Sequence, residues 1–305
     1  MIMRTTLILK TWTLVVAASL LASACGSGGN ESNSIELVAT TSILGDITSN
    51  LVDGTVTLTT IMPAGADPHE FEPSARQVAT LRSADLIIAN GLGLEESLED
   101  VLRAAVEDGV VLVEVGPEVN PLPLAAAGEY DPHVWLDPVR MIEAVDLITT
   151  ALTDLDASVD WVAGASSYRA ELQTLDGWIE QQFDSIDPSA RVLFTGHQAF
   201  GYFAARYGFD VVATILPGAT TTVEPSASGF AAVVEMLEAS SVQAVFTDIT
   251  ESQALAEQLV GQVDRTVEVV PLYVGALGPE GSGADSYLGL MRSNVETIRM
   301  VFERC

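Results

Sequence analysis

The chain has 305 residues and is strongly acidic, with a formal net charge of −29 at pH 7 from 42 Asp and Glu residues against 13 Lys and Arg residues. We therefore exclude a nucleic-acid-binding function, because phosphate contacts require a basic surface. We interpret the negative net charge as an acidic surface that is exposed to solvent. Only Cys25 and Cys305 are present, so the chain is not a disulfide scaffold, and its length is sufficient for a hydrophobic core to stabilise the fold.

The first residues are typical of an export signal. Arg4 and Lys10 form a basic start, and the apolar run 14–21 is too short to span a bilayer. Small residues then precede Cys25, which resembles a bacterial lipobox whose cysteine is lipidated; a plain secretory signal with an incidental cysteine is the alternative. We predict a lipoprotein signal peptide over 1–24, a flexible Gly/Ser/Asn-rich tether over 25–34, and an extracytoplasmic protein anchored to a bacterial membrane, either in the periplasm or at the cell surface.

From residue 35 onward, short apolar runs alternate with helical patterns. Strands are expected over residues 36–40, 56–62, 85–90 and 110–115. Helices are expected over residues 43–52, 75–83 and 94–107, and, after a Pro/Ala/Gly-rich loop over 117–130, over 138–153. Strands that alternate with helices predict βαβ units and a parallel sheet.

A long stretch without proline over 158–183 interrupts this alternation. Large residues from Trp161 through Tyr168 to Phe183 recur at helical spacing and predict one long helix. Gly164 and Gly177 weaken this prediction, because a glycine inside a helix lowers the stability of the helix by roughly 1 kcal/mol relative to alanine.

The alternation then resumes toward the carboxyl end. Strands are expected over residues 192–195, 210–216, 244–247 and 267–272. Helices are expected over residues 200–207, 227–239, 252–261 and 285–302. We predict an α/β fold with two lobes, residues 35–157 and 187–305, each with a mainly parallel sheet. A rigid linking helix over 158–186 joins them.

The chain contains only three histidines, His69, His133 and His197. The first two share the tripeptide Asp-Pro-His, and the third follows a predicted strand. We expect each of them at the end of a strand, where open α/β sheets place ligands. One histidine alone is usually an ordinary polar residue, but three of them at such positions predict a metal site, since neutral imidazole is the commonest metal ligand in proteins.

Four segments together resemble a known family: Ala39–Asp46, Gly65–Ser74, Asp131–Pro138 and His197–Tyr202. They are similar to the cluster A-I solute-binding proteins, the ZnuA/TroA-like receptors of zinc and manganese ABC importers. The similarity runs from about residue 35 to the carboxyl terminus. It implies two α/β lobes bridged by one rigid helix, with the metal in the cleft between the lobes.

The resemblance also implies a ligand set. His69 and His133 would come from the first lobe, His197 from the second, and Asp285 would be the fourth ligand. An aspartate that opens a helix is also a common N-cap, which is the alternative role for Asp285.

The resemblance and the ligand types together favour Zn²⁺, with Mn²⁺ as the alternative cargo. Imidazole suits zinc, whereas oxygen-rich sites suit manganese. Manganese and iron receptors of the family usually carry Glu in place of the third histidine, which is His197 here. The implied partners are an ABC permease and its ATPase, with the receptor as a monomer. A manganese or iron receptor and a metal-binding surface adhesin remain alternative functions.

Two further carboxylates are candidates to orient an imidazole from its outer nitrogen: Asp248, at a predicted strand end, and Glu72, close to His69. Asp248 has the alternative role of capping the next helix. Glu70 and Glu72 have the alternative role of acidic residues at a helix start.

A zinc hydrolase would belong to a different class of function. It requires an open coordination position and a general base, for which Glu70 and Glu72 are the obvious candidates. The chain has no His-Glu-x-x-His motif, no Gly-x-Ser-x-Gly motif and no phosphate-binding loop. Four protein ligands would also leave the metal no open position, so we expect a binding protein and no enzymatic activity.

Overall fold

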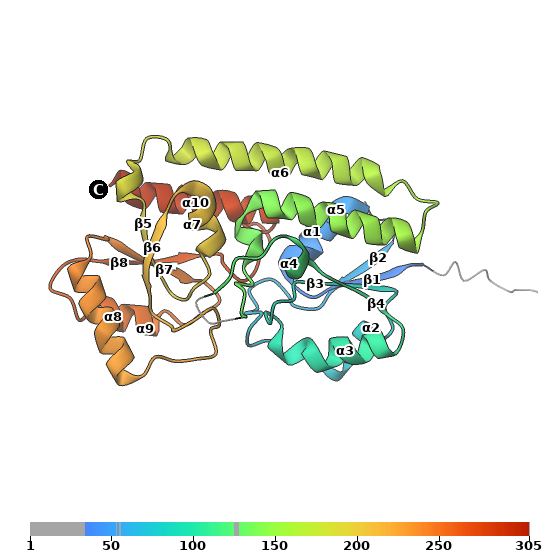
Figure 1. Ribbon diagram of the computed structural model, residues 1–305, viewed down its shortest axis with the longest axis horizontal. Helices are drawn as coiled ribbons and strands as arrows, with labels where there is room; N and C mark the ends of the chain where they lie inside the picture. The colour runs from blue at the N-terminus through green and yellow to red at the C-terminus, as the bar shows by residue number, and fades with distance from the viewer. Residues whose placement is uncertain (1–33, 53, 55, 125–127, 305) are drawn as a thin grey trace, which may run out of the picture. The chain divides into compact units, whose positions relative to one another are not determined.

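The computed structural model describes residues 34–304 except 53, 55 and 125–127 (Figure 1). The predicted signal peptide, Cys25 and residues 25–33 of the tether lie outside the described residues. Residues 35–305 form one compact unit, within which the predicted lobe boundaries at 157 and 187 stay predictions. Among the described residues, no helix combines the length and the apolar character that a membrane crossing requires.

The first half of this unit contains a four-stranded parallel sheet in the order β2-β1-β3-β4. Its strands are β1 (Glu36–Ala39), β2 (Thr57–Thr60), β3 (Leu86–Ala89) and β4 (Val111–Glu114). The connections contain α1 (Ser42–Val52), α2 (Ala75–Arg82), the 3₁₀ turn η1 (Glu96–Leu98) and α3 (Glu99–Glu107). The predicted parallel sheet is confirmed.

Both faces of this sheet are buried. Leu37 and Ala39 of β1 belong to the core that includes α1, whereas Val38 belongs to a second apolar cluster with Leu81 of α2 and Leu102 of α3. Successive side chains of a strand point to opposite faces, which accounts for this alternation. Helices accordingly lie on both sides of the sheet in Figure 1.

The second half repeats the architecture with the strand order β6-β5-β7-β8, again all parallel. Its strands are β5 (Val192–Thr195), β6 (Asp210–Thr214), β7 (Ala244–Asp248) and β8 (Glu268–Leu272). Its helices are α7 (Gly201–Tyr207), α8 (Ala227–Ala239), α9 (Ala254–Val260) and α10 (Tyr287–Glu303), and the 3₁₀ turn η3 (Pro188–Ala190) precedes β5.

Between the two sheets the chain forms α4 (Val115–Glu118), the 3₁₀ turn η2 (Val134–Leu136), α5 (Pro138–Leu155) and α6 (Trp161–Phe183). The predicted long helix is confirmed as α6, although it is shorter than 158–186. It begins after Asp160, whose side chain accepts a hydrogen bond from Val162 N, and ends before Pro188. Helix α6 packs on α1 and α5 of the first half and on α7 and α10 of the second, as Figure 1 shows.

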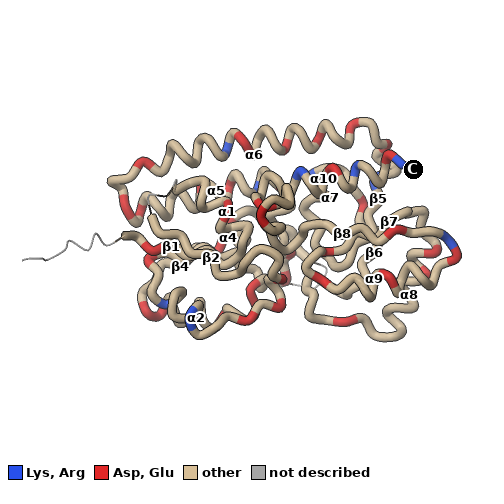
Figure 2. Tube along the Cα trace, turned by 180° about the vertical axis from the view of Figure 1, so that it is seen from behind, with Lys and Arg blue, Asp and Glu red and all other residues tan. Residues whose placement is uncertain are grey.

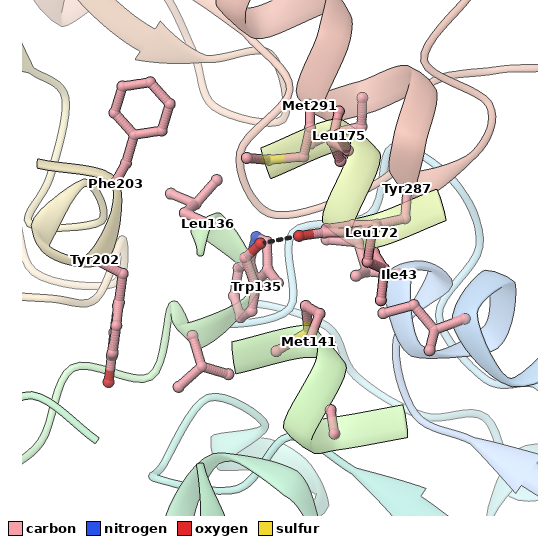
Figure 3. Packing of buried hydrophobic residues seen from close by; sticks show 14 of the residues in the cluster. Ile43, Trp135, Leu136, Met141, Leu172, Leu175, Tyr202, Phe203, Tyr287 and Met291 are labelled. Carbon is pink, nitrogen blue, oxygen red and sulfur yellow. Dashed lines mark hydrogen bonds between the residues drawn. The ribbon is translucent and has the colours of Figure 1, made fainter. Parts of the chain in front are cut away.

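Buried hydrogen bonds join the two halves beneath α6. The Tyr287 hydroxyl donates to the Trp135 carbonyl over 2.6 Å, and Trp135 Nε1 donates to the Val274 carbonyl over 2.8 Å. Figure 3 shows Tyr287 and Trp135 in the same buried cluster as Leu172 and Leu175 of α6. Since buried polar groups must find partners, these side chains fix Trp135, and with it the adjoining His133, against the second half.

Side chains and backbone of the first half also hold the segment before α10 and the first residue of this helix. Ser42 Oγ accepts from Leu277 N over 3.1 Å, and Gly65 N donates to the Leu277 carbonyl over 3.0 Å. Asp46 Oδ2 accepts from Tyr287 N over 2.8 Å and so places a carboxylate at the start of α10. These contacts oppose a large opening of the two halves.

The two glycines of α6 differ in their surroundings, which gives a test of this packing. A Cβ at Gly177 would meet nothing within 4 Å, whereas a Cβ at Gly164 would lie 2.8 Å from the Leu51 carbonyl of α1. We expect Gly177→Ala to raise the free energy of unfolding by about 0.5–1 kcal/mol. Gly164→Ala should lower it by about 1–3 kcal/mol through overpacking. Urea unfolding followed by circular dichroism measures both, and equal effects would contradict the contact between α6 and α1.

Candidate metal centre

The structure brings the three histidines together, although 64 residues separate each from the next. His133 Nε2 lies 3.3 Å from His69 Nε2 and 3.1 Å from His197 Nε2. One ring nitrogen from each histidine lies within 4.8 Å of the others, and all three side chains are buried. Among the described residues this is the group of His, Cys, Asp and Glu side chains that could hold a metal ion.

His69 lies in the loop between β2 and α2, as expected. Ser74 caps α2 with its side chain and forms a reciprocal capping box with Gln77, so the loop ends before Ala75. Asp67 Oδ1 accepts from His69 N over 2.9 Å, which closes a short turn around Pro68. Pro68 restricts the loop further, because its own φ is fixed.

The turn around His133 is the same as that around His69, but His133 does not lie where the sequence predicted. Asp131 Oδ1 accepts from His133 N over 3.0 Å, as Asp67 does for His69. The expectation that His133 ends a strand is wrong: the residue follows an isolated bridge between Pro123 and Tyr130 and precedes η2. Its position is set by the Asp-Pro turn and by Trp135, which is anchored to the second half.

His197 follows β5 by two residues and is therefore at a strand end, as predicted. Thr195 Oγ1 donates to the His197 carbonyl over 2.9 Å. Gln198 N donates to the Gly218 carbonyl over 2.9 Å. The loop is thus held on both sides of the imidazole.

In two of the three imidazoles a carboxylate lies beside the outer nitrogen, Nδ1, which points away from the other histidines. His133 Nδ1 lies 2.7 Å from Asp131 Oδ1, and His197 Nδ1 lies 2.7 Å from Glu251 Oε1. A metal-binding histidine commonly donates its other ring N–H to a carboxylate, which fixes the ring and the tautomer. By contrast, the buried His69 Nδ1 has no hydrogen-bond partner within the described part of the chain.

This arrangement of protons favours a cation at the centre of the cluster. When the Nδ1 atoms of His133 and His197 carry their protons toward Asp131 and Glu251, the two Nε2 atoms face each other with lone pairs across 3.1 Å. Two acceptors at that distance repel each other unless a cation lies between them. Tetrahedral ligation at about 2.0–2.1 Å also places neighbouring nitrogens about 3.3–3.4 Å apart, which is close to the observed spacing.

The pKa values of the imidazoles diverge for physical reasons. Burial, reinforced by the two neighbouring histidines, lowers the pKa of His69 to about 3, and burial also lowers the pKa of His133. Although burial of His197 acts in the same direction, the hydrogen bond and the negative charge of Glu251 raise its pKa above the ordinary value. Burial raises the pKa of the Asp131 carboxyl to about 7.

Asp285 does not join the cluster. Its side chain is exposed, and Asp285 Oδ2 accepts from Gly281 N over 2.8 Å. The alternative N-cap role is wrong, because Ser286 caps α10 by accepting from Gly289 N. The structure therefore gives Asp285 a role in the turn before α10.

Glu70 and Glu72 are exposed and precede the Ser74 cap, so they are not part of α2.

Asp248 lies at the end of β7, buried behind His197. Asp248 Oδ1 accepts from Thr250 N over 3.0 Å, and Asp248 Oδ2 accepts from Gly275 N over 2.7 Å. Burial raises the pKa of its carboxyl to about 6. Asp248 acts on His197 through its charge, while Glu251, which the sequence reasoning missed, lies beside the ring nitrogen.

Residues 37–301 match the family described as zinc-uptake complex component A, periplasmic (ZnuA). The chain belongs to this family. Members of the ZnuA family are solute-binding proteins of metal ABC transporters, so the resemblance of the four sequence segments is confirmed.

Individual relatives are similar in sequence to nearly the whole chain. The manganese-binding lipoprotein MntA of Halalkalibacterium halodurans is 31% identical over 292 residues, which cover 93% of this chain and 95% of the relative. The zinc-binding protein TroA of Treponema pallidum is 31% identical over 270 residues, covering 86% and 87%. The solved structure of TroA from T. pallidum superposes with a TM-score of 0.83 at 28% identity, covering 88% of this chain and 99% of that one.

Proton release is the first test of the site. Glu251 raises the pKa of His197 above its ordinary value, and a metal binds this imidazole only after it displaces the proton. We expect zinc binding to release protons, and zinc affinity to rise, as pH increases from about 6 to 8. Calorimetry in buffers of different ionisation enthalpy measures this. An affinity that is constant over that interval would contradict the assignment.

The outer carboxylate of His197 gives a second test. Glu251→Gln should lower zinc affinity by about 10–100-fold, because the carboxylate no longer fixes the ring and its tautomer. Glu224→Gln is the matched control, since Glu224 is exposed and loses the same charge. Competition with a chromophoric chelator measures both variants. Equal losses would show that total charge, and not the contact with His197, supports binding.

Proposed function

We propose that this protein captures a divalent transition metal outside the cytoplasm and delivers it to the permease of an ABC importer. The observation that carries the proposal is the convergence of three imidazole nitrogens at the junction of the two halves, with spacing that suits tetrahedral ligation. His69, His133 and His197 are the proposed ligands. The membership of the ZnuA family and the names of the relatives support the same function.

Zinc is the proposed cargo, with manganese as the alternative. Three imidazoles are a nitrogen-rich, borderline-soft set that suits zinc better than manganese. The relatives do not distinguish the two, since TroA is named as zinc-binding and MntA as manganese-binding. The acidic residues on both halves in Figure 2 would attract any divalent cation and so do not favour one metal.

The location and the partners complete the proposal. Cys25 would carry a lipid that tethers a monomeric receptor to a bacterial membrane, in agreement with the word lipoprotein in the name of MntA. The loaded protein would dock on a permease that is driven by a separate ATPase. We propose a binding function with no enzymatic activity, in agreement with the membership of a family of metal-binding transport proteins.

Thermal unfolding with added metals tests this function. We expect Zn²⁺ to raise the unfolding temperature of the metal-stripped protein and to bind with a stoichiometry of one. At a thousandfold excess over its dissociation constant, a ligand of the folded state adds roughly 4 kcal/mol of stability. Mn²⁺ and Fe²⁺ should produce smaller shifts. A larger shift with manganese would make manganese the cargo, and no shift with any of the three would overturn the proposed function.

Two variants test whether the zinc-dependent shift of the unfolding temperature arises at the three histidines. His197→Ala should abolish most of the zinc-dependent shift, because it removes a ligand from the second half. Asp285→Asn should retain the whole shift, since Asp285 is exposed and bonded to Gly281 N. An unchanged shift in His197→Ala would contradict the site.

A further inference from the structure

The two peptide carbonyls that precede His133 each accept a hydrogen bond from a buried side chain. Asn90 Nδ2 donates to the Pro132 carbonyl over 2.9 Å. The Tyr202 hydroxyl donates to the Asp131 carbonyl over 2.6 Å. Asn90 directly follows β3 in the first half, whereas Tyr202 belongs to α7 in the second half. Side chains from both halves therefore hold the backbone immediately before this imidazole.

His133 is the central residue of a tight turn. Its φ of −81° and ψ of 43° lie near those of an inverse γ-turn, and Val134 N donates to the Pro132 carbonyl over 2.9 Å. Asn90 thus donates to the same oxygen that closes the turn. A shift of this carbonyl would rotate the peptide that carries the imidazole.

A buried carboxylate fixes the backbone of Asn90. Glu95 Oε1 accepts from Asn90 N over 2.7 Å, and Glu95 Oε2 accepts from Gly91 N over 3.0 Å. Thr40, which directly follows β1, donates its hydroxyl to Glu95 Oε1 over 2.7 Å. Since a buried carboxylate is costly without such donors, the three hydrogen bonds keep Glu95 in one position.

The turn between Asn90 and Glu95 has an uncommon backbone conformation. Gly91, Leu92 and Gly93 all have positive φ, and the value at Leu92 is 57°. A non-glycine residue rarely adopts this conformation and keeps it only where the surrounding structure imposes it. By accepting from the two N–H groups at the start of the turn, Glu95 sets the direction in which Asn90 presents its side-chain amide.

The contact from the second half is equally constrained. The Tyr202 hydroxyl accepts from Leu122 N over 2.9 Å in addition to donating to the Asp131 carbonyl. A Cβ at Gly201 would lie 2.6 Å from Asp131 Oδ2, so only glycine at the start of α7 allows Asp131 to lie this close. The hydroxyl is thus bonded to two backbone segments of the first half.

From these contacts we propose that Asn90 and Tyr202 are positioning residues that hold His133 from opposite halves, with Glu95 orienting Asn90. The inference rests on the proposed metal-binding function and assigns a role to side chains that are not proposed ligands. Trp135 anchors the chain after His133, and Asn90 and Tyr202 anchor it before. The imidazole between these anchors keeps its place relative to the other two before the cargo arrives.

Tyr202→Phe tests the contact from the second half, because it removes one hydroxyl and keeps the ring. We expect it to lower zinc affinity by about 10-fold, the lower end of the effect of residues that orient metal ligands. Tyr207→Phe is the matched control: Tyr207 lies buried on the same helix, and its hydroxyl donates to Asp176 Oδ1 over 3.0 Å. Competition with a chromophoric chelator measures both variants. Equal affinities in the two variants would overturn the proposal.

A double variant tests whether the two contacts act on the same imidazole. Asn90→Ala should also lower zinc affinity by about 10-fold. Combined with Tyr202→Phe, it should lower affinity by much less than the product of the two single losses, because the backbone before His133 is already displaced. Single losses that multiply in the double variant would show two independent effects and would overturn a shared action on His133.

The visible spectrum of the Co²⁺-loaded protein separates positioning from a general loss of stability. Asn90→Ala and Tyr202→Phe should shift its bands, since they move one ligand of the metal. Leu152→Ala, which removes a buried side chain near the far end of α5, should lower the unfolding temperature and leave the bands unchanged. Bands that are unchanged in all three variants would overturn the positioning role and leave the proposed function intact. Failure of the wild-type protein to bind either Zn²⁺ or Co²⁺ would overturn the proposed function itself.

Discussion

The arrangement of protons on three imidazoles is the constraint on which the site depends. Asp131 and Glu251 lie 2.7 Å from the Nδ1 atoms of His133 and His197, and when both Nδ1 atoms carry the only ring proton, the two Nε2 lone pairs face one another. In that protonation state the neutral imidazoles repel one another, and a cation bound between their Nε2 atoms would remove the repulsion. Burial strengthens both effects, because a low dielectric increases the repulsion of the lone pairs as well as the attraction of the metal.

The rest of the fold keeps these imidazoles at their spacing. Helix α6 packs on both halves, and the buried chain of hydrogen bonds through Trp135, Val274 and Tyr287 crosses the junction beside His133. The three imidazoles therefore come from two halves that these contacts hold against each other. Selection among divalent metals depends on geometry as well as on ligand type, and the family contains relatives named for zinc and for manganese.

Sequence reasoning identified the imidazoles because the chain has only three of them, and the turn geometry of Asp67 and Asp131 follows from the repeated Asp-Pro-His tripeptide. It left the role of Asp285 open, because a carboxylate before a helix is compatible with a ligand, a cap or a turn, and only tertiary contacts choose among them. Glu251 was missed for a similar reason. It lies in a turn three residues beyond Asp248, where nothing in the local pattern indicates that its carboxylate reaches His197.

The sequence by itself determined the alternation of strands and helices, the long helix α6 and the identity of the three imidazoles, because these depend on apolar periodicity and on residue types. Tertiary structure decided which carboxylates face an imidazole and which accept from backbone N–H groups. That choice depends on contacts between segments far apart in the chain, such as Thr221 with Asp67 and Gly275 with Asp248. The carboxylate that faces each imidazole is therefore a property of the folded molecule, since it depends on which segments meet.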